Sequence, residues 1–210
     1  MGVKLPPLPE RIKRLQTDSR GFPVPWFVVW YDGKPDFRVT DADKKQLAVT
    51  ARLCWICGEP LGPELCFVAT PICAVYRDAP EPPCHRECGI FAARACPFLT
   101  KPRMRRWESG MPEESVPAVG DVDMSPGAAM LWITRSYKTR EVDDDIVFEM
   151  GEPVEVVWMV EGRDATRAEA WESIKDQLSE LIEHAQKRGP QAVQDLRRRF
   201  AKSLDLLPRT

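Results

Sequence analysis

The sequence predicts an α+β protein, and three features indicate this fold class. Short runs of β-branched and aromatic residues, bounded by Gly, Pro and Asp, occur within residues 22–39 and again within residues 128–161. Apolar residues recur at helical spacing from residue 166 to residue 207. Between these regions lies the segment that contains all seven cysteines of the chain. With 210 residues, the chain is long enough for one domain or two small ones.

Residues 1–50 are predicted to form an N-terminal arm and a β-hairpin. The run from residue 22 to residue 31 is followed by Asp32-Gly33 and then by a second short run that ends at residue 39. Asp-Gly between two such runs is a typical hairpin turn. Thr40 or Asp41 can then cap a helix over residues 42–50, which leads to the first cysteine.

The second half of the chain is predicted to begin with a linker or long loop over residues 107–127. Residues 128–210 then contain a three-stranded antiparallel β-meander, which ends near residue 161, and two helices. Thr166 and Glu169 have the spacing of a capping box at the start of the first helix. Gly189-Pro190 separates the two helices, because Gly favours a helix end and Pro a first helical position.

The cysteines indicate a metal site more than a disulfide framework. Their number is odd, and no secretory signal precedes them. Cys54 and Cys57 have the spacing of a zinc knuckle, and His85 and Cys88 are three residues apart at an expected helix start. These four residues are the predicted ligands of a Zn²⁺ ion, with Cys84 as the alternative to His85.

Residues 51–106 therefore form a predicted zinc-binding module. A knuckle, a β-hairpin over residues 67–76 and a helix with the second ligand pair give the layout of treble-clef zinc fingers, which this segment resembles. Four protein ligands leave no open position for a reactive water, so we expect the zinc to be structural. Core packing is the expected role of Cys66, Cys73 and Cys96.

The sequence favours a binding protein over an enzyme and names no catalytic residue. Nucleotide-binding loops, the serine-hydrolase elbow and the metalloprotease helix motif are absent from it. Residues 85–87 match the H-x-E of zinc deaminases, but here Cys-x-x-Cys comes first, which reverses the order of that family. A zinc-braced HNH nuclease would need a further histidine base, and only His184 remains. An enzyme with a non-zinc site near the turn at residues 161–166 is the alternative.

Two candidate binding surfaces flank the predicted metal. Trp55 lies inside the knuckle, whose tip often faces solvent, and it is the predicted anchor for a protein partner. A basic patch beside the metal is the alternative, and it would bind nucleic acid through phosphate contacts. The residues of this predicted patch are Arg94, Lys101, Arg103, Arg105 and Arg106.

Composition and charge restrict the partners and the location. The formal net charge is −2, so the chain has no overall field that attracts nucleic acid or an acidic membrane. The longest apolar runs have the length of strands, and the N-terminus lacks an apolar signal region. We therefore expect a cytoplasmic protein that does not associate with membranes.

Several stretches of the chain resemble a group of bacterial and phage proteins to which no activity has been assigned. The resemblance implies one integrated unit in a bacterial cytoplasm, or in a host cytoplasm if the protein is phage-encoded. It suggests an accessory, regulatory or anti-defence role and supplies no catalytic residue. The stretches that carry it are residues 20–28, 32–38, 53–62, 81–88, 96–99 and 161–166.

Overall fold

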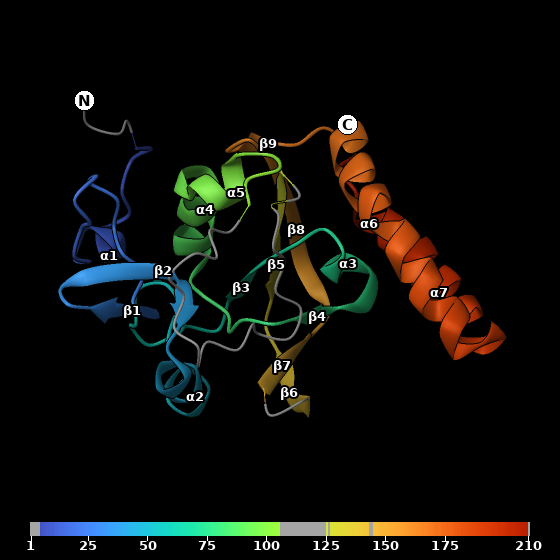
Figure 1. Cartoon of the computed structure of the whole chain (residues 1–210), viewed down its shortest axis with the longest axis horizontal. Helices are drawn as coiled ribbons and strands as arrows, with labels where there is room; N and C mark the ends of the chain where they lie inside the picture. Colours follow the sequence, from blue (N-terminus) through green and yellow to red (C-terminus); the bar gives the residue numbers. More distant parts are fainter. Residues whose placement is uncertain (1–4, 106–124, 126, 143–144, 210) are drawn as a thin grey trace.

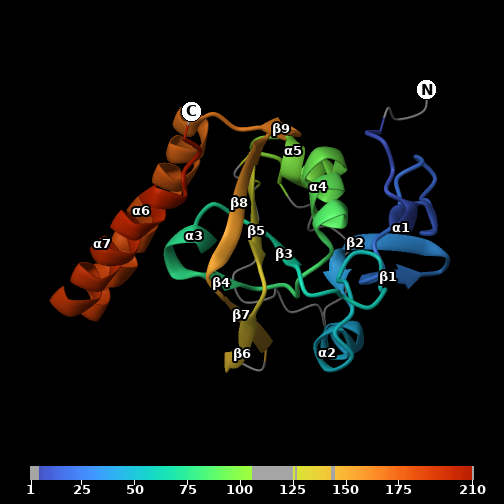
Figure 2. The same cartoon turned by 180° about the vertical axis from the view of Figure 1, so that it is seen from behind.

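The computed structural model describes residues 5–105, 125, 127–142 and 145–209. It is an α+β structure with antiparallel sheets, as the sequence predicts. Helices lie on both sides of a central sheet (Figures 1 and 2). The predicted linker, apart from residues 125 and 127, lies outside the described residues.

The N-terminal part confirms the predicted hairpin and helix. Tyr31 pairs with Lys34 at the end of the hairpin, and Asp32 and Gly33 both have positive φ, as a type I′ turn requires. The side chain of Asp41 accepts a hydrogen bond from the backbone N–H of Lys44 and thus caps the helix. The elements are α1 (Glu10–Lys13), β1 (Val28–Tyr31), β2 (Lys34–Thr40) and α2 (Ala42–Thr50).

The central sheet has the strand order β3-β5-β8-β9 and is antiparallel throughout. Every residue of β5 is buried, and all of them except Thr134 are apolar, so the strand presents apolar side chains to both faces. Ala129, Leu131 and Ile133 belong to one buried cluster, the first core, whereas Met130 and Trp132 belong to the other, the second core. The sheet thus separates two cores. Its strands are β3 (Leu65–Ala69), β5 (Ala128–Thr134), β8 (Pro153–Val160) and β9 (Arg163–Asp164).

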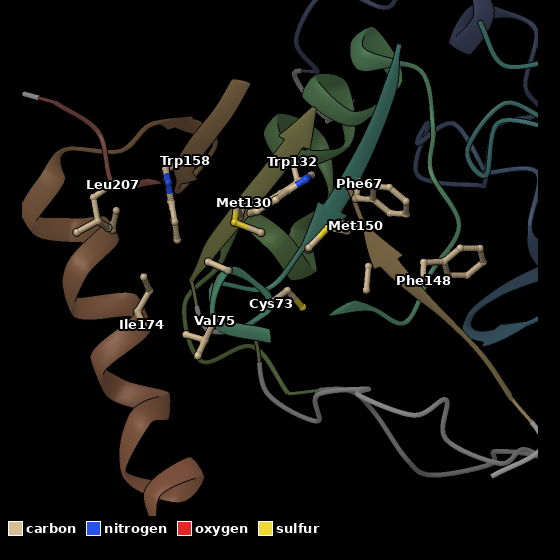
Figure 3. Close-up of a cluster of buried hydrophobic side chains, with 14 of the residues drawn as sticks. Phe67, Cys73, Val75, Met130, Trp132, Phe148, Met150, Trp158, Ile174 and Leu207 are labelled. Carbon is tan, nitrogen blue, oxygen red and sulfur yellow. The ribbon is translucent and has the colours of Figure 1, made fainter. Parts of the chain in front are cut away.

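Different helices cover the two faces of this sheet. The helices α4 (Arg86–Ala95) and α5 (Pro97–Thr100) lie on one side, and α6 (Arg167–Arg188) and α7 (Pro190–Ser203) lie on the other (Figure 1). Figure 3 shows Ile174 of α6 pointing toward the sheet in the second core. No described helix has the length and apolarity needed to cross a membrane.

The predicted three-stranded meander is four strands, divided between two sheets. The strand that begins at residue 128 stops at Thr134, and the chain turns at residues 135–136 before β6. The physical reason is a change of environment, since β5 is fully buried and β6 is largely exposed. The second sheet has the order β4-β7-β6 and is formed by β4 (Asp78–Ala79), β7 (Asp145–Met150) and β6 (Tyr137–Val142).

The prediction of a β-hairpin over residues 67–76 is wrong. Strand β3 pairs with β5 instead, and Ala69 lies opposite Met130 at its end. The chain then passes Pro71, which has no N–H to donate to a ladder. The apolar residues that follow form the short helix α3 (Cys73–Tyr76), which packs into the second core.

The first C-terminal helix and the start of the second agree with their predicted boundaries, but the second ends at Ser203, before the end of the predicted apolar stripe at Leu207. Thr166 and Glu169 form the complete capping box, and Gly189, with φ of 106°, separates α6 from α7. A short 3₁₀ helix, η1 (Leu204–Leu206), follows α7. The indole Nε1–H of Trp158 donates to the carbonyl of Leu206 at 2.8 Å, which fastens the end of the chain to β8.

The capping box should show a clear pH signature. The guanidinium of Arg163 bonds to the Glu169 carboxylate and, together with Thr166, lowers its pKa from 4.5 to about 2. A carboxyl whose pKa is lowered on folding contributes stability above its ordinary pKa, and this contribution is lost as pH falls from 4.5 through 2. A carboxyl ¹³C NMR titration checks this, and Arg163→Gln should move the midpoint upward. An unchanged midpoint would contradict the assigned cause.

Candidate metal centre

The first two candidate ligands lie in a tight knuckle after α2. The backbone N–H of Cys57 points at Cys54 Sγ, 3.5 Å away, and the Gly58 N–H donates to the Cys54 carbonyl at 2.8 Å. Gly58 has φ of 75°, and a Cβ there would come within 2.7 Å of the Trp26 ring. Glycine is therefore required both by the turn and by the close approach of Trp26.

The second pair lies at the start of α4. His85 is the N-cap residue of this helix, and Cys88 is in its first turn. An antiparallel bridge between Cys66 and Cys84 brings the chain from the sheet to this helix start. The backbone N–H of His85 then donates to Cys54 Sγ at 3.3 Å, which joins the two halves of the site. Backbone N–H groups directed at sulfur favour the thiolate form.

The four predicted ligand residues converge on one point. The sulfurs of Cys54, Cys57 and Cys88 and a ring nitrogen of His85 all lie within 4.8 Å of one another. His85 Nδ1 is 3.4 Å from the Cys57 sulfur and 4.0 Å from the Cys88 sulfur. Cys54 and Cys88 are buried, and Cys57 and His85 are half-buried. This group can hold one metal ion.

The structure places His85, and not Cys84, with the other three residues. His85 Nε2 is 3.0 Å from the carbonyl oxygen of Pro60, so a proton on Nε2 donates there and leaves Nδ1 as the ligand atom. The thiol of buried Cys84 instead donates to the Cys66 carbonyl at 3.1 Å. The Pro60 contact has no signal in the sequence, because it depends on the path of the chain after the knuckle.

Hydrogen bonds within the group distribute its protons unevenly. Those from the Cys57 and Cys88 thiols lower the pKa of Cys54, and bonding to that thiolate raises the pKa of Cys57 to about 11. The hydrogen bond with Cys54 also raises the pKa of His85. A divalent cation that replaces these protons would be bound by thiolates and a neutral imidazole, so its affinity should fall as pH falls.

Trp55 is not the exposed anchor that the sequence predicts. Its side chain is only 2% exposed and stacks on Phe27, with ring centroids 4.7 Å apart. Its Nε1–H donates to the Glu81 carboxylate at 3.0 Å. The knuckle tip faces the segment that leads into the β1–β2 hairpin, and Trp26 donates its backbone N–H to the Ile56 carbonyl. Trp55 therefore fastens the hairpin segment to the candidate metal centre.

The residues of the predicted basic patch differ in their surroundings. Arg94 forms an ion pair with Asp164 at 3.7 Å. The side chains of Lys101, Arg103 and Arg105 are exposed, and within the described part of the chain no side chain pairs with them. Arg106 lies outside the described residues.

Two exposed charged side chains in the turn at residues 161–166 are paired with groups outside the turn. Arg163 bonds to Glu169, and Asp164 pairs with Arg94. These contacts stabilise the start of α6 and link the turn to the end of α4. Neither residue lines the hollow between α3 and α7.

The choice of the fourth ligand can be tested by substitution. His85→Ala should weaken metal binding by about 10-fold or more, because it removes a ligand, whereas Cys84→Ala should retain the metal. Competition with a chromogenic chelator measures both affinities. His85→Cys is the conservative control and should restore binding. A larger loss in Cys84→Ala than in His85→Ala would contradict the assignment.

The chain matches no protein-family model, no curated protein and no solved structure. The function is therefore inferred from the residues and their geometry.

Proposed function

We propose that this protein is a zinc-stabilised binding protein whose metal holds the fold and does not react. The observation that carries the proposal is the convergence of three sulfurs and one imidazole nitrogen on a single point. A tetrahedral zinc ion with such ligands has ligand atoms roughly 3.5 to 4 Å apart. His85 Nδ1 lies at similar distances, 3.4 Å and 4.0 Å, from the sulfurs of Cys57 and Cys88. Three thiolates and one histidine form a closed structural site, with no position left for a substrate or a reactive water.

The position of the site fits a structural role. The knuckle carries Trp55, on which Phe27 stacks, and α4 packs on the central sheet. A zinc ion bound there would tie the N-terminal hairpin segment, the knuckle and α4 into one core. Such a core provides a rigid base for a binding surface.

A protein partner is the proposed ligand, and the β1–β2 hairpin offers the aromatic surface. Trp30, Tyr31 and Phe37 are all exposed on this two-stranded ribbon, in contrast to Trp55. Exposed aromatic side chains are enriched where proteins bind one another. The hairpin thus replaces the knuckle tip as the proposed contact surface.

A matched pair of variants tests this function. Trp30→Ser with Tyr31→Ser removes two exposed aromatic groups, and Ile182→Ser removes an apolar group from α6 with the same 37% exposure as Trp30. Immobilised protein should capture a partner from a lysate of its native host, and the aromatic double variant should lose it. Equal capture by the double variant and by Ile182→Ser would contradict a role of the hairpin.

Nucleic-acid binding through Lys101, Arg103 and Arg105 is the second candidate. It is favoured by the exposure of these three side chains and by the lack of any pairing side chain within the described residues. Binding to duplex DNA should then weaken steeply with salt and in Lys101→Gln with Arg103→Gln. Lys187→Gln with Arg188→Gln, on α6, is the control of equal charge.

A further inference from the structure

A hollow of about 280 Å³ lies where α3 meets α7, away from the candidate metal centre. In Figures 1 and 2, α3 lies between the central sheet and the C-terminal helical pair. Residues of α3 and α7 belong to the second core, whereas the cysteine ligands Cys54 and Cys88 belong to the first. The hollow and the candidate metal centre are therefore on opposite faces of β5.

Four basic residues line this hollow, and none of the described lining residues is acidic. Arg77 comes from the end of α3, and Arg198, Arg199 and Lys202 come from α7. This gathering stands out in a chain with a formal net charge of −2. Like charges in a shared hollow repel one another, so an anion that enters it is stabilised by all four.

The acidic side chains that pair with these basic residues are exposed to solvent. Arg77 pairs with Glu152, whose side chain is 81% exposed. Arg198 pairs with Asp195 one turn earlier on the same helix, which is an exposed i,i+3 pair. No described side chain pairs with the ammonium of Lys202. Exposed pairs of this kind contribute little, so an incoming anion can replace them at low cost.

Two of the guanidinium groups are held in place by aromatic rings. Arg77 lies over the Trp132 ring at 5.5 Å, and its backbone N–H donates to the Cys73 carbonyl at 2.7 Å. Arg199 lies over the Tyr76 ring at 5.9 Å and donates to the Tyr76 carbonyl at 3.4 Å. Guanidinium groups that are fixed before binding lose less entropy when they bind an anion.

We propose that this hollow binds the phosphate groups of a small, multiply charged phosphorylated ligand such as a diphosphate. Guanidinium groups match phosphate oxygens with two parallel hydrogen bonds, and an ammonium adds a point charge. The volume of about 280 Å³ is just below the range of roughly 300 to 1,000 Å³ for drug-sized ligands, which suits a ligand of one or two phosphate groups. The charges converge from two elements into one hollow, whereas a nucleic-acid duplex is met by basic groups spread along an extended surface.

Pyrophosphate is the probe for this site, titrated calorimetrically into the zinc-loaded protein of 210 residues. Arg198→Gln with Lys202→Gln removes two lining charges and should raise the Kd by about 10-fold or more, as charge-assisted hydrogen bonds are lost. Lys187→Gln with Arg197→Gln is the matched control, because both residues are exposed on the same helical pair and do not line the hollow. The control should stay within about twofold of the parent affinity.

Three results would overturn the proposal. One is the absence of saturable pyrophosphate binding at low salt. Another is an equal loss of affinity in both double variants, which would indicate diffuse attraction by surface charge. The third is tight binding of duplex DNA that pyrophosphate does not displace, which would assign the basic residues to a nucleic-acid surface. If the double variant loses its cooperative unfolding transition, the pyrophosphate affinity of the single variant Lys202→Gln is compared with that of the parent and the control instead.

Discussion

Replacing Cys88 by serine is expected to unfold the metal-centred half of the protein. Cys88 is fully buried and its sulfur is one of the four converging ligand atoms. Binding of structural zinc contributes on the order of 10 kcal/mol in small zinc modules, which is comparable to the whole stability of a typical domain. Serine is a poor zinc ligand and leaves the remaining buried sulfurs without their shared cation, so the variant loses most of this free energy.

Circular dichroism during thermal unfolding, together with the metal content, measures this effect. Cys96→Ser is the matched control, because Cys96 lies at the far end of α4 and is not part of the converging group. The control should keep the metal and unfold near the parent temperature. A Cys88→Ser protein with an unchanged transition would show that the fold does not depend on the site.

Replacing Trp132 by alanine is expected to lower the free energy of unfolding by about 3 to 5 kcal/mol. Among the described residues, Trp132 is the largest fully buried side chain, and it lies in the second core (Figure 3). Its Nε1–H donates to the Gly151 carbonyl at 2.8 Å, and the guanidinium of Arg77 lies over its ring. The substitution leaves a cavity in the second core and removes the indole N–H that donates to the Gly151 carbonyl.

Urea unfolding measures this loss, and Trp171→Ala is the control. Trp171 is half-buried on α6 and contacts the Phe200 ring in a tilted arrangement, with ring centroids 5.6 Å apart. Its replacement should lower the free energy of unfolding by less than half as much, because less apolar surface leaves the core. Equal losses in the two variants would place the main core between α6 and α7 instead of at β5.

Features with a local cause could be predicted from the sequence. The turn at Asp32-Gly33, the N-cap Asp41 and the capping box of Thr166 with Glu169 depend on residues within four positions of one another. The spacing of the cysteines likewise reflects the geometry of one small site. In each case the physical requirement, such as positive φ or an unpaired N–H, is met by neighbours in the chain.

Features set by distant parts of the chain could not be predicted in the same way. Strand β3 pairs with β5, which follows more than 55 residues later, and nothing in residues 67–76 encodes that choice over a local hairpin. Trp55 is buried because Phe27 and Glu81 reach it from both directions along the sequence. The choice between His85 and Cys84 as the fourth ligand is limited in the same way, because the two residues are adjacent in the sequence. Contacts with distant residues distinguish them: His85 lies against the Pro60 carbonyl, and Cys84 forms a bridge with Cys66.

The basic hollow between α3 and α7 also could not be predicted from the sequence. Arg198 and Arg199 belong to a run of three arginines in the sequence, and such a run on a helix usually forms a solvated face. Arg77 is more than 120 positions earlier in the chain, at a helix end where φ is 59°. Only the contact of α3 with α7 brings these charges together, so the fold and not the run creates the candidate site.

X-ray absorption at the zinc edge, on protein purified without a histidine tag, tests the central claim most directly. Metal analysis of the same sample should give about one zinc per chain. The spectrum should fit three sulfur ligands at about 2.3 Å and one nitrogen ligand at about 2.0 to 2.1 Å. A fully folded protein without metal, or a site with four sulfurs that includes Cys84, would contradict the assignment of Cys54, Cys57, His85 and Cys88 as the ligands.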